Sequence, residues 1–169
     1  MKMVKLDWSQ VQGLTHELLR QLHESAWRPD YVVGITRGGL VPAVMISQYL
    51  GCDMHALKVS LRDGDIDCES NLWMAEDALT GKNILIVDDI NDTGATLNWI
   101  MRDWPAGCHP ADERWEQVWN HNVRFAVVVD NLASRCSVGM DYFGEEINKD
   151  EDPAWIVFPW ESWWKGTAQ

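Results

Sequence analysis

The chain has 169 residues, which is enough for one domain with a sizeable hydrophobic core and too few for two such domains. Its 26 acidic side chains outnumber its 14 basic ones, and the resulting formal net charge of −12 excludes a broad basic surface for nucleic acid. The four cysteines contain no Cys-x-x-Cys pair, so the sequence indicates neither a zinc site nor a disulfide framework.

The same composition leads to expectations about the location of the protein. No apolar run approaches the roughly 18 residues of a membrane-spanning helix, and the first residues contain no apolar signal core. We therefore expect a soluble, cytoplasmic protein with reduced thiols, without a nucleic-acid partner and not inserted in a membrane. The 11 tryptophans are expected to fill the core or subunit contacts, because large aromatic rings are enriched at both.

The first predicted element is an amphipathic helix from Trp8 to Leu22, and Ser9 is its candidate N-cap. The apolar stripe of this helix consists of Val11, Leu14, Leu18, Leu19 and Leu22. A turn at Pro29-Asp30 then separates the helix from the first strong strand, 31–35.

A glycine-containing loop, 36–42, follows that strand and leads into a predicted helix, 43–50. The adjacent residues Gly38 and Gly39 allow a ligand to approach the main chain, and Arg37 supplies a fork of donors that suits phosphate oxygens. The loop therefore predicts an anion site, with an ordinary turn as the alternative interpretation.

A second strand is predicted over 54–60, and the residues after it form a polar, acidic stretch without periodicity, 61–70. Loops of this length inside a compact domain are commonly functional. A functional loop is therefore predicted in this stretch.

The strongest signal in the sequence begins with four apolar residues, Ile84 to Val87, which predict a short strand buried on both faces. Asp88 and Asp89 come directly after this run. They are expected at the carboxyl end of a central parallel strand, where open α/β sheets bind their ligands.

Residues 92–96, Asp-Thr-Gly-Ala-Thr, predict an anion site at the start of a helix that continues over 97–101. Thr93 or Thr96 can cap this helix, and Gly94 permits a tight turn, so that free N–H groups and hydroxyls can surround a phosphate. Carboxylates beside a phosphate repel it unless they bind sugar hydroxyls or a divalent cation. The pattern therefore predicts a ribose 5-phosphate site, with a solvated turn and an ordinary capped helix as the alternative.

The remaining elements are predicted from weaker patterns. Residues 98–121 are interpreted as the end of one helix, a loop and a short polar helix. A buried strand over 123–129 ends at Asp130-Asn131, again at the ligand edge of the sheet. The acidic residues 142–153 are expected to form a solvated loop.

Two of these motifs and the end of the chain resemble those of a known family. The string from Asp88 to Thr96 resembles the signature of the type I phosphoribosyltransferases, and residues 36–42 are similar to their pyrophosphate loop. The Trp-Ile-x-x-Pro-Trp-acid ending, 155–161, is similar to the base-binding tail of the xanthine-guanine enzymes. The resemblance implies an α/β fold, an open, mainly parallel twisted sheet with flanking helices. It also implies a single domain, 1–169, in which residues 61–75 form a flexible catalytic loop and the tail, 142–169, forms a small C-terminal base-binding hood.

For the site, the resemblance implies Asp92 as a general acid or base, and Asp88 and Asp89 as ligands of the ribose and, through water, of Mg²⁺. It assigns the 5′-phosphate to Thr93, Gly94, Ala95 and Thr96, the pyrophosphate to Arg37, Gly38 and Gly39, and the base to Trp155, Ile156 and Asn131. Further candidates for pyrophosphate contacts are Lys58, Ser60 and Arg62. The implied reaction is transfer of a phosphoribosyl group to xanthine, guanine or hypoxanthine in purine salvage, by a homo-oligomer that is a dimer or a tetramer.

Two departures from the family pattern leave the activity open. Leu61 follows Ser60, so the aromatic residue of the family's Ser-Tyr pair is absent, and Asn131 stands where purine-specific relatives have a lysine. An asparagine offers a donor and an acceptor but no charge. The alternatives are therefore a regulatory protein that senses phosphoribosyl pyrophosphate or a nucleotide without chemistry, and a phosphoribosyltransferase for another base.

Overall fold

The structure, a computed structural model, describes residues 1–61 and 66–165. Among these residues, no helix is long and apolar enough to cross a membrane. The strands are β1 (Lys2–Lys5), β2 (Tyr31–Thr36), β3 (Asp53–Ser60), β4 (Asp67–Cys68), β5 (Ile84–Asn91), β6 (Val123–Asn131), β7 (Tyr142–Ile147) and β8 (Ala154–Val157). The helices are α1 (Trp8–Ser25), α2 (Leu40–Leu50), α3 (Leu72–Leu79) and α4 (Ala95–Gly107), with 3₁₀ helices η2 (Glu113–Gln117) and η3 (Trp163–Lys165).

The main sheet has six strands in the order β4-β3-β2-β5-β6-β7. Every neighbouring pair in this sheet is parallel except β3 and β4, which are antiparallel. The predicted α/β fold with an open, mainly parallel sheet is therefore confirmed.

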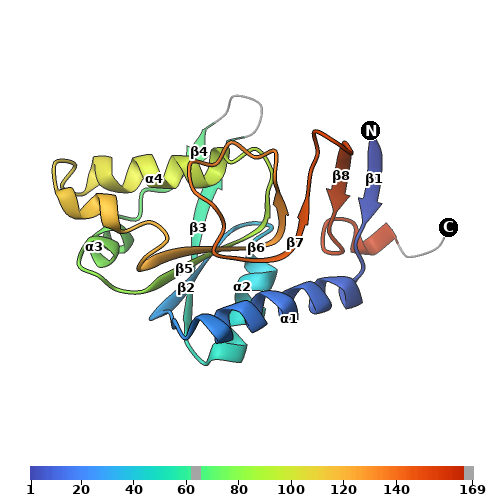
Figure 1. The fold of residues 1–169 in the computed structure, drawn as a ribbon, viewed down its shortest axis with the longest axis horizontal. Helices are drawn as coiled ribbons and strands as arrows, with labels where there is room; N and C mark the ends of the chain where they lie inside the picture. The colour runs from blue at the N-terminus through green and yellow to red at the C-terminus, as the bar shows by residue number, and fades with distance from the viewer. Residues whose placement is uncertain (62–65, 166–169) are drawn as a thin grey trace.

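Helices cover both faces of the sheet, with α1 and α2 on one face and α3 and α4 on the other (Figure 1). Successive residues of a strand point to opposite faces. Val32 in β2 therefore packs with residues of α1 and α2, whereas Val33 belongs to the core beneath α3 and α4. Because both faces are buried, a central strand such as β5 begins with an unbroken apolar run, which explains why Ile84–Val87 predicts it so clearly.

The N-cap of the first helix is not the predicted residue, Ser9. Asp7 is the N-cap of α1, and its carboxylate accepts a hydrogen bond from the Gln10 N–H (2.7 Å). The Gln10 side chain accepts from the Asp7 N–H in return (2.8 Å). This capping box satisfies two backbone donors, so the prediction of Ser9 as the cap was wrong.

Residues 142–147 form the edge strand β7, so the prediction of a solvated loop over 142–153 was wrong for this part. β7 pairs in parallel with β6, and Ile147 lies opposite Asn131. Edge strands carry charged side chains such as the exposed Glu146 because one of their sides is not covered by a neighbouring strand.

The tail of the chain pairs with its beginning. β8 and β1 form a separate, parallel two-stranded sheet in which Trp155 lies opposite Met3 and Ile156 opposite Val4. The Leu6 N–H extends the pairing with a hydrogen bond to the Val157 carbonyl oxygen (2.9 Å). Figure 1 shows this small sheet beyond β7. The segment predicted as the hood is therefore held by the first strand, a long-range pairing that the sequence patterns do not predict.

The predicted catalytic loop, 61–75, contains two regular elements within its described residues. β4 pairs with the end of β3, so that Ser60 lies opposite Asp67, and α3 begins at Leu72. Arg62 lies outside the described residues.

Candidate active site

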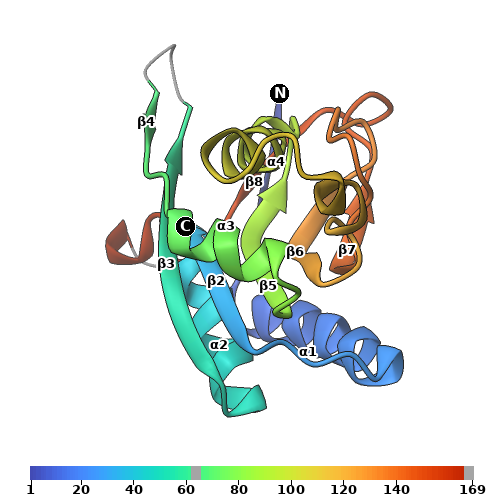
Figure 2. The same ribbon diagram turned by 90° about the vertical axis from the view of Figure 1, so that its left-hand side faces the viewer.

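The candidate site lies between β2 and β5, at the point where the chain reverses its progress across the sheet (Figure 2). β2 leads into α2 on one face, and its neighbour β5 leads into α4 on the other. Such a switch point opens a crevice at the carboxyl ends of the two strands, and ligands bind there. The loops that carry the predicted motifs therefore meet at one place.

The glycine loop after β2 packs directly against β5. A Cβ at Gly39 would collide with the carbonyl oxygen of Val87, and a Cβ at Gly38 would overlap the carboxylate of Asp89. Arg37 is exposed beside them, and the peptide bond that precedes it is cis. The two glycines thus bring the main chain of the predicted pyrophosphate loop into contact with the acidic pair.

Both carboxylates of the pair are held by the main chain. Asp88 Oδ1 accepts a hydrogen bond from the Asp89 N–H (2.9 Å), and Asp89 Oδ1 accepts one from the Ile90 N–H (2.8 Å). Burial, followed by the neighbouring Asp89 carboxylate, raises the pKa of Asp88 well above its usual range. Perturbed carboxyl groups in a crevice are typical of functional sites, where a ligand can supply hydroxyl donors or a cation.

We expect Asp88→Asn to stabilise the unliganded protein. Because the folded state holds the Asp88 proton more tightly than the unfolded state, wild-type stability falls as the pH rises from the ordinary value of 3.8 toward the raised pKa. Asparagine removes this loss and can still accept from the Asp89 N–H. The expected gain is about 1 kcal/mol near neutral pH, or roughly 2–4 °C in Tm.

Scanning calorimetry in EDTA at about pH 5.5, 6.5 and 7.5 measures this effect, and the gain should increase with pH. Asp152→Asn is the control, because Asp152 is an exposed acid whose carboxylate pairs with Lys2 (2.6 Å). A gain that is equal at all three pH values would rule out the charge of Asp88 as its cause.

The predicted phosphate loop lies at the amino end of α4. Gly94 is the N-cap, with φ of 88°, and a Cβ there would collide with the backbone of Cys136. Thr93 Oγ1 accepts from the Ala95 N–H (3.2 Å). The prediction that Thr93 or Thr96 caps the helix was wrong, because the chain enters α4 through the left-handed turn at Gly94. The helix macrodipole still favours an anion at this position.

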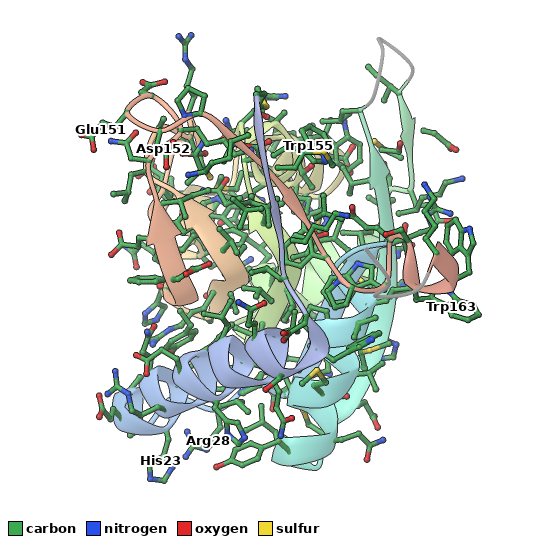
Figure 3. The ribbon with its side chains drawn as sticks, turned by 90° about the vertical axis from the view of Figure 1, so that its right-hand side faces the viewer. His23, Arg28, Glu151, Asp152, Trp155 and Trp163 are labelled. Carbon is green, nitrogen blue, oxygen red and sulfur yellow. The ribbon has the colours of Figure 1, made fainter. Side chains whose placement is uncertain are left out.

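Asp92 lies beside a lysine that the sequence analysis did not identify. Its Oδ1 is 2.8 Å from Lys149 Nζ, and this ammonium is 5.7 Å from the centroid of the Trp155 ring. Trp155 is 52% exposed and therefore does not serve core packing. It projects from β8 at the end of the molecule where the central strands terminate (Figure 3). A single lysine in an acidic segment belongs to no motif, so only the structure relates it to Asp92.

Asn131 is buried and contacts Asp92. Its Nδ2 donates to the Asp92 carbonyl oxygen (2.9 Å), and its Oδ1 accepts from the Ala133 N–H (3.1 Å) and the Lys149 N–H (3.0 Å). Both polar atoms of Asn131 thus have protein partners. This arrangement favours a positioning role for Asn131 over the predicted contact with the base.

Three other predicted residues lie at the margins of the site. Ile156 is buried in β8. Ser60 is the last residue of β3, and Lys58 pairs with Asp67 across the β3–β4 contact (2.6 Å). The hydrogen bond to Asp67 raises the pKa of Lys58, which keeps this side chain cationic.

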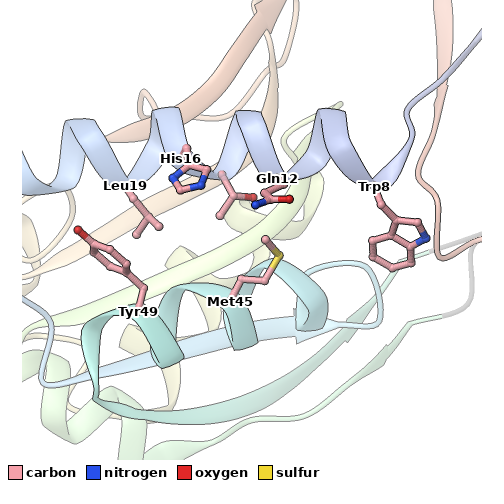
Figure 4. A pocket seen from close by; sticks show the side chains of 7 residues that line it. Trp8, Gln12, His16, Leu19, Met45 and Tyr49 are labelled. Carbon is pink, nitrogen blue, oxygen red and sulfur yellow. The ribbon is translucent and has the colours of Figure 1, made fainter.

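A pocket of about 330 Å³ lies elsewhere, between α1 and α2 (Figure 4). It is lined mainly by Trp8, Leu19, Met45 and Tyr49, together with His16. The described lining residues include neither a carboxylate nor a lysine or arginine. We therefore assign the sugar-phosphate chemistry to the strand ends and not to this pocket.

The acidic pair also suits a divalent cation. Within residues 1–61 and 66–165, no group of three or more histidine, cysteine, aspartate or glutamate side chains is arranged to hold a metal. Mg²⁺, however, usually takes one or two protein carboxylates and completes its shell with water and substrate phosphates. Asp88 and Asp89 fit this pattern.

The switch point, the acidic pair and the helix start together define a doubly wound α/β protein with a candidate site for a phosphorylated sugar. The profile of the phosphoribosyl transferase domain matches residues 6–164. Xanthine-guanine phosphoribosyltransferase from Cereibacter sphaeroides is 30% identical over 173 aligned positions, which cover 92% of this chain and 85% of the relative. This chain belongs to the phosphoribosyltransferase family, and the resemblance seen in the sequence is confirmed.

Solved structures agree with this assignment. Purine phosphoribosyltransferase from Pyrococcus horikoshii is 28% identical, with a TM-score of 0.68 over 96% of both chains. Xanthine-guanine-hypoxanthine phosphoribosyltransferase from Helicobacter pylori is 19% identical, with a TM-score of 0.69 over 95% of both chains. The structure from H. pylori shows that this chain has the same fold as that enzyme.

Proposed function

We propose that this protein transfers the 5-phosphoribosyl group from phosphoribosyl pyrophosphate to a purine base, xanthine, guanine or hypoxanthine, in purine salvage. The observation that carries the proposal is the contact between the glycine loop at Gly38 and the carboxylate of Asp89, in the segment that leads from β5 to the helix start at Gly94. One crevice thus offers a pyrophosphate loop, acceptors for sugar hydroxyls and an anion site. The names of the relatives from C. sphaeroides and P. horikoshii support a purine as the acceptor.

Each part of the site suits one part of the substrates. The Asp88–Asp89 pair accepts hydrogen bonds from the ribose hydroxyls, residues 93–96 receive the 5′-phosphate, and residues 37–39 receive the pyrophosphate. Trp155 stacks on the base, because an indole face matches a bicyclic ring, and the main chain of Ile156 reads the edge of that ring.

The reaction breaks the bond between ribose C1 and a pyrophosphate oxygen and forms a bond from C1 to a ring nitrogen of the base. That nitrogen releases its proton to Asp92, and the pyrophosphate leaves with the electron pair of the broken bond. The residues of this chain act by aligning the two substrates, holding the ribose and limiting the access of water. Asp89, through water, and Asp88 would hold Mg²⁺, which would supply charge neutralisation for the leaving group.

A panel of guanine, xanthine, hypoxanthine, adenine and uracil, each with phosphoribosyl pyrophosphate and Mg²⁺, tests the proposal by chromatography of the nucleotides formed. We expect product with guanine, xanthine or hypoxanthine, and loss of that product in EDTA. Binding of phosphoribosyl pyrophosphate without transfer to any base would favour the regulatory sensor instead. Transfer to adenine or uracil alone would correct the base and leave the family assignment intact.

We also propose that the protein works in the cytoplasm as a homo-oligomer, a dimer or a tetramer. Its exposed large aromatic side chains support self-association, because such side chains are enriched where subunits meet. They include Trp8, Tyr49, Trp163 and Trp164. Sedimentation equilibrium measures the mass, and a monomer at micromolar concentration would contradict this assignment.

A further inference from the structure

A short segment after β6, residues 134–137, lies against the predicted phosphate loop. The Arg135 N–H donates a hydrogen bond to the Thr93 carbonyl oxygen (2.9 Å). The backbone of Cys136 occupies the space that a Cβ at Gly94 would need. These four residues, which we call the bracing segment, therefore pack directly on the left-handed turn through which the chain enters α4.

One side chain of α4 holds the bracing segment from the helix side. Asn98 Nδ2 donates to the Arg135 carbonyl oxygen, and Asn98 Oδ1 accepts from the Ser137 N–H, each at 2.9 Å. The Asn98 N–H in turn donates to the Gly94 carbonyl oxygen (3.0 Å), so this residue closes the first turn of the helix. An amide suits the position because it contains both a donor and an acceptor.

A second asparagine holds the bracing segment from the side of the sheet. Ser134 Oγ donates to Asn91 Oδ1 (2.9 Å) and accepts from the Cys136 N–H (3.1 Å). Asn91 is the buried last residue of β5, and its Nδ2 donates to Asp130 Oδ1 (2.9 Å) near the end of β6. The bracing segment is thus fixed both to α4 and to the ends of two strands.

These contacts are important because the start of α4 depends on its neighbours. Gly94, the N-cap, has no side chain that could bond the first amides of the helix, and a glycine is free to leave the φ of 88° that it adopts here. An anion at a helix start is bound by backbone N–H groups that point at one place. Fixing this geometry before the ligand arrives removes the cost of ordering it on binding.

Resting on the proposed function, we propose that Asn98 is a positioning residue for the 5′-phosphate of the sugar. It acts through the bracing segment, which keeps the turn at Gly94 in the conformation that presents the first amides of α4 to the phosphate. None of the hydrogen bonds described above involves the pyrophosphate loop, residues 37–39. Loss of the Asn98 amide should therefore weaken only one of the two phosphate sites.

Calorimetric titration with ribose 5-phosphate and, separately, with pyrophosphate and Mg²⁺ measures the two sites independently. Asn98→Ala should weaken the binding of ribose 5-phosphate by about 5- to 20-fold, the range for loss of one or two hydrogen bonds, and change pyrophosphate binding by less than about twofold. Ser134→Ala removes the other anchor of the same segment and should produce the same difference. Because either change releases one segment, the double variant should lose less than the product of the two single losses.

Asn83→Ala is the matched control. Its side-chain amide also bonds a backbone carbonyl oxygen, that of Arg28 (3.0 Å), but next to the first residue of β5, at the opposite end of that strand. This variant should bind both ligands as the wild type does. Melting curves by circular dichroism check that each variant is folded, and Ser134→Ala carries the test if Asn98→Ala does not fold.

The inference and the proposed function fail in different ways. Unchanged affinity for ribose 5-phosphate in the folded variants, or an equal loss for both ligands, would overturn the role of Asn98, and so would a wild type that does not bind ribose 5-phosphate. The panel of bases decides the transferase separately. If no nucleotide forms from any base while Asn98→Ala weakens the binding of ribose 5-phosphate alone, the transferase is overturned and Asn98 positions the phosphate site of a sensor.

Discussion

Asp92→Asn should lower kcat by about 10²- to 10⁴-fold, the usual contribution of a positioned general base, with little change in the affinity for phosphoribosyl pyrophosphate. Asparagine keeps the size of the side chain, and its oxygen can still accept from Lys149, whose Nζ lies 2.8 Å from Asp92 Oδ1. It cannot take the proton that the ring nitrogen of the base must lose. The chemical step therefore slows, while the groups expected to bind the sugar and its phosphates, at Asp88 and over 93–96, are unaltered.

Steady-state kinetics with saturating guanine measure kcat, and calorimetric titration with phosphoribosyl pyrophosphate measures binding. Asp152→Asn serves as the control, because this exposed carboxylate also pairs with a lysine and should leave both quantities unchanged. Equal losses in turnover and in phosphoribosyl pyrophosphate affinity would assign Asp92 to substrate binding and not to proton transfer.

The arrangement of the expected sugar-phosphate residues could be predicted because each group of them is contiguous in the chain. The apolar run Ile84–Val87 predicts a central strand. The acids and the glycine turn that follow this run must therefore lie at the carboxyl end of that strand. The glycine loop around Gly38 follows another strand in the same way. Once the sheet is parallel, both loops lie at one edge, so local patterns are sufficient to bring them together.

The base half could not be predicted in the same way, because its residues meet only through long-range strand pairing. Residues 142–147 contain Gly144 and two glutamates, which are typical of a loop, yet they form β7. Gly144 is required by packing, since a Cβ there would lie 2.5 Å from the Val128 carbonyl oxygen and 2.7 Å from Leu14 Cβ of α1. Neither contact can be recognised from the residues next to Gly144 in the sequence. The position of Lys149 depends on the pairing of β7 with β6.

The role of Asn131 is a further property that the sequence alone does not determine. Its position after a buried apolar run predicts the correct edge of the sheet, but not the direction of its side chain. In the structure its amide turns inward and links Asp92 to the Lys149 main chain. A residue type that suits both a base contact and a positioning contact can be assigned only when its partners are known.

Gly38→Ala should lower kcat/KM for phosphoribosyl pyrophosphate by about 10²-fold or more while leaving the fold intact. A Cβ at Gly38 would overlap the Asp89 carboxylate, so this carboxylate must move and lose the hydrogen bond that Asp89 Oδ1 accepts from the Ile90 N–H (2.8 Å). A displacement of about 1 Å in a group that aligns the substrate is sufficient for a loss of this size. Because the collision involves the end of a side chain, the change in Tm should be no more than a few degrees, about 2–4 °C.

Gly13→Ala is the matched control for this substitution, since a Cβ there would have no described atom within 4 Å apart from its chain neighbours and the backbone of its own helix. Gly13 lies inside α1, where alanine is expected to stabilise the helix by about 0.5–1 kcal/mol and to leave the kinetics unchanged. Initial rates at limiting phosphoribosyl pyrophosphate, with melting curves of both variants, separate an effect on the site from an effect on folding. If Gly38→Ala retained the wild-type kcat/KM, the contact between the glycine loop and Asp89 could not be what aligns the ribose with the pyrophosphate, and the assignment of residues 37–39 would have to be abandoned.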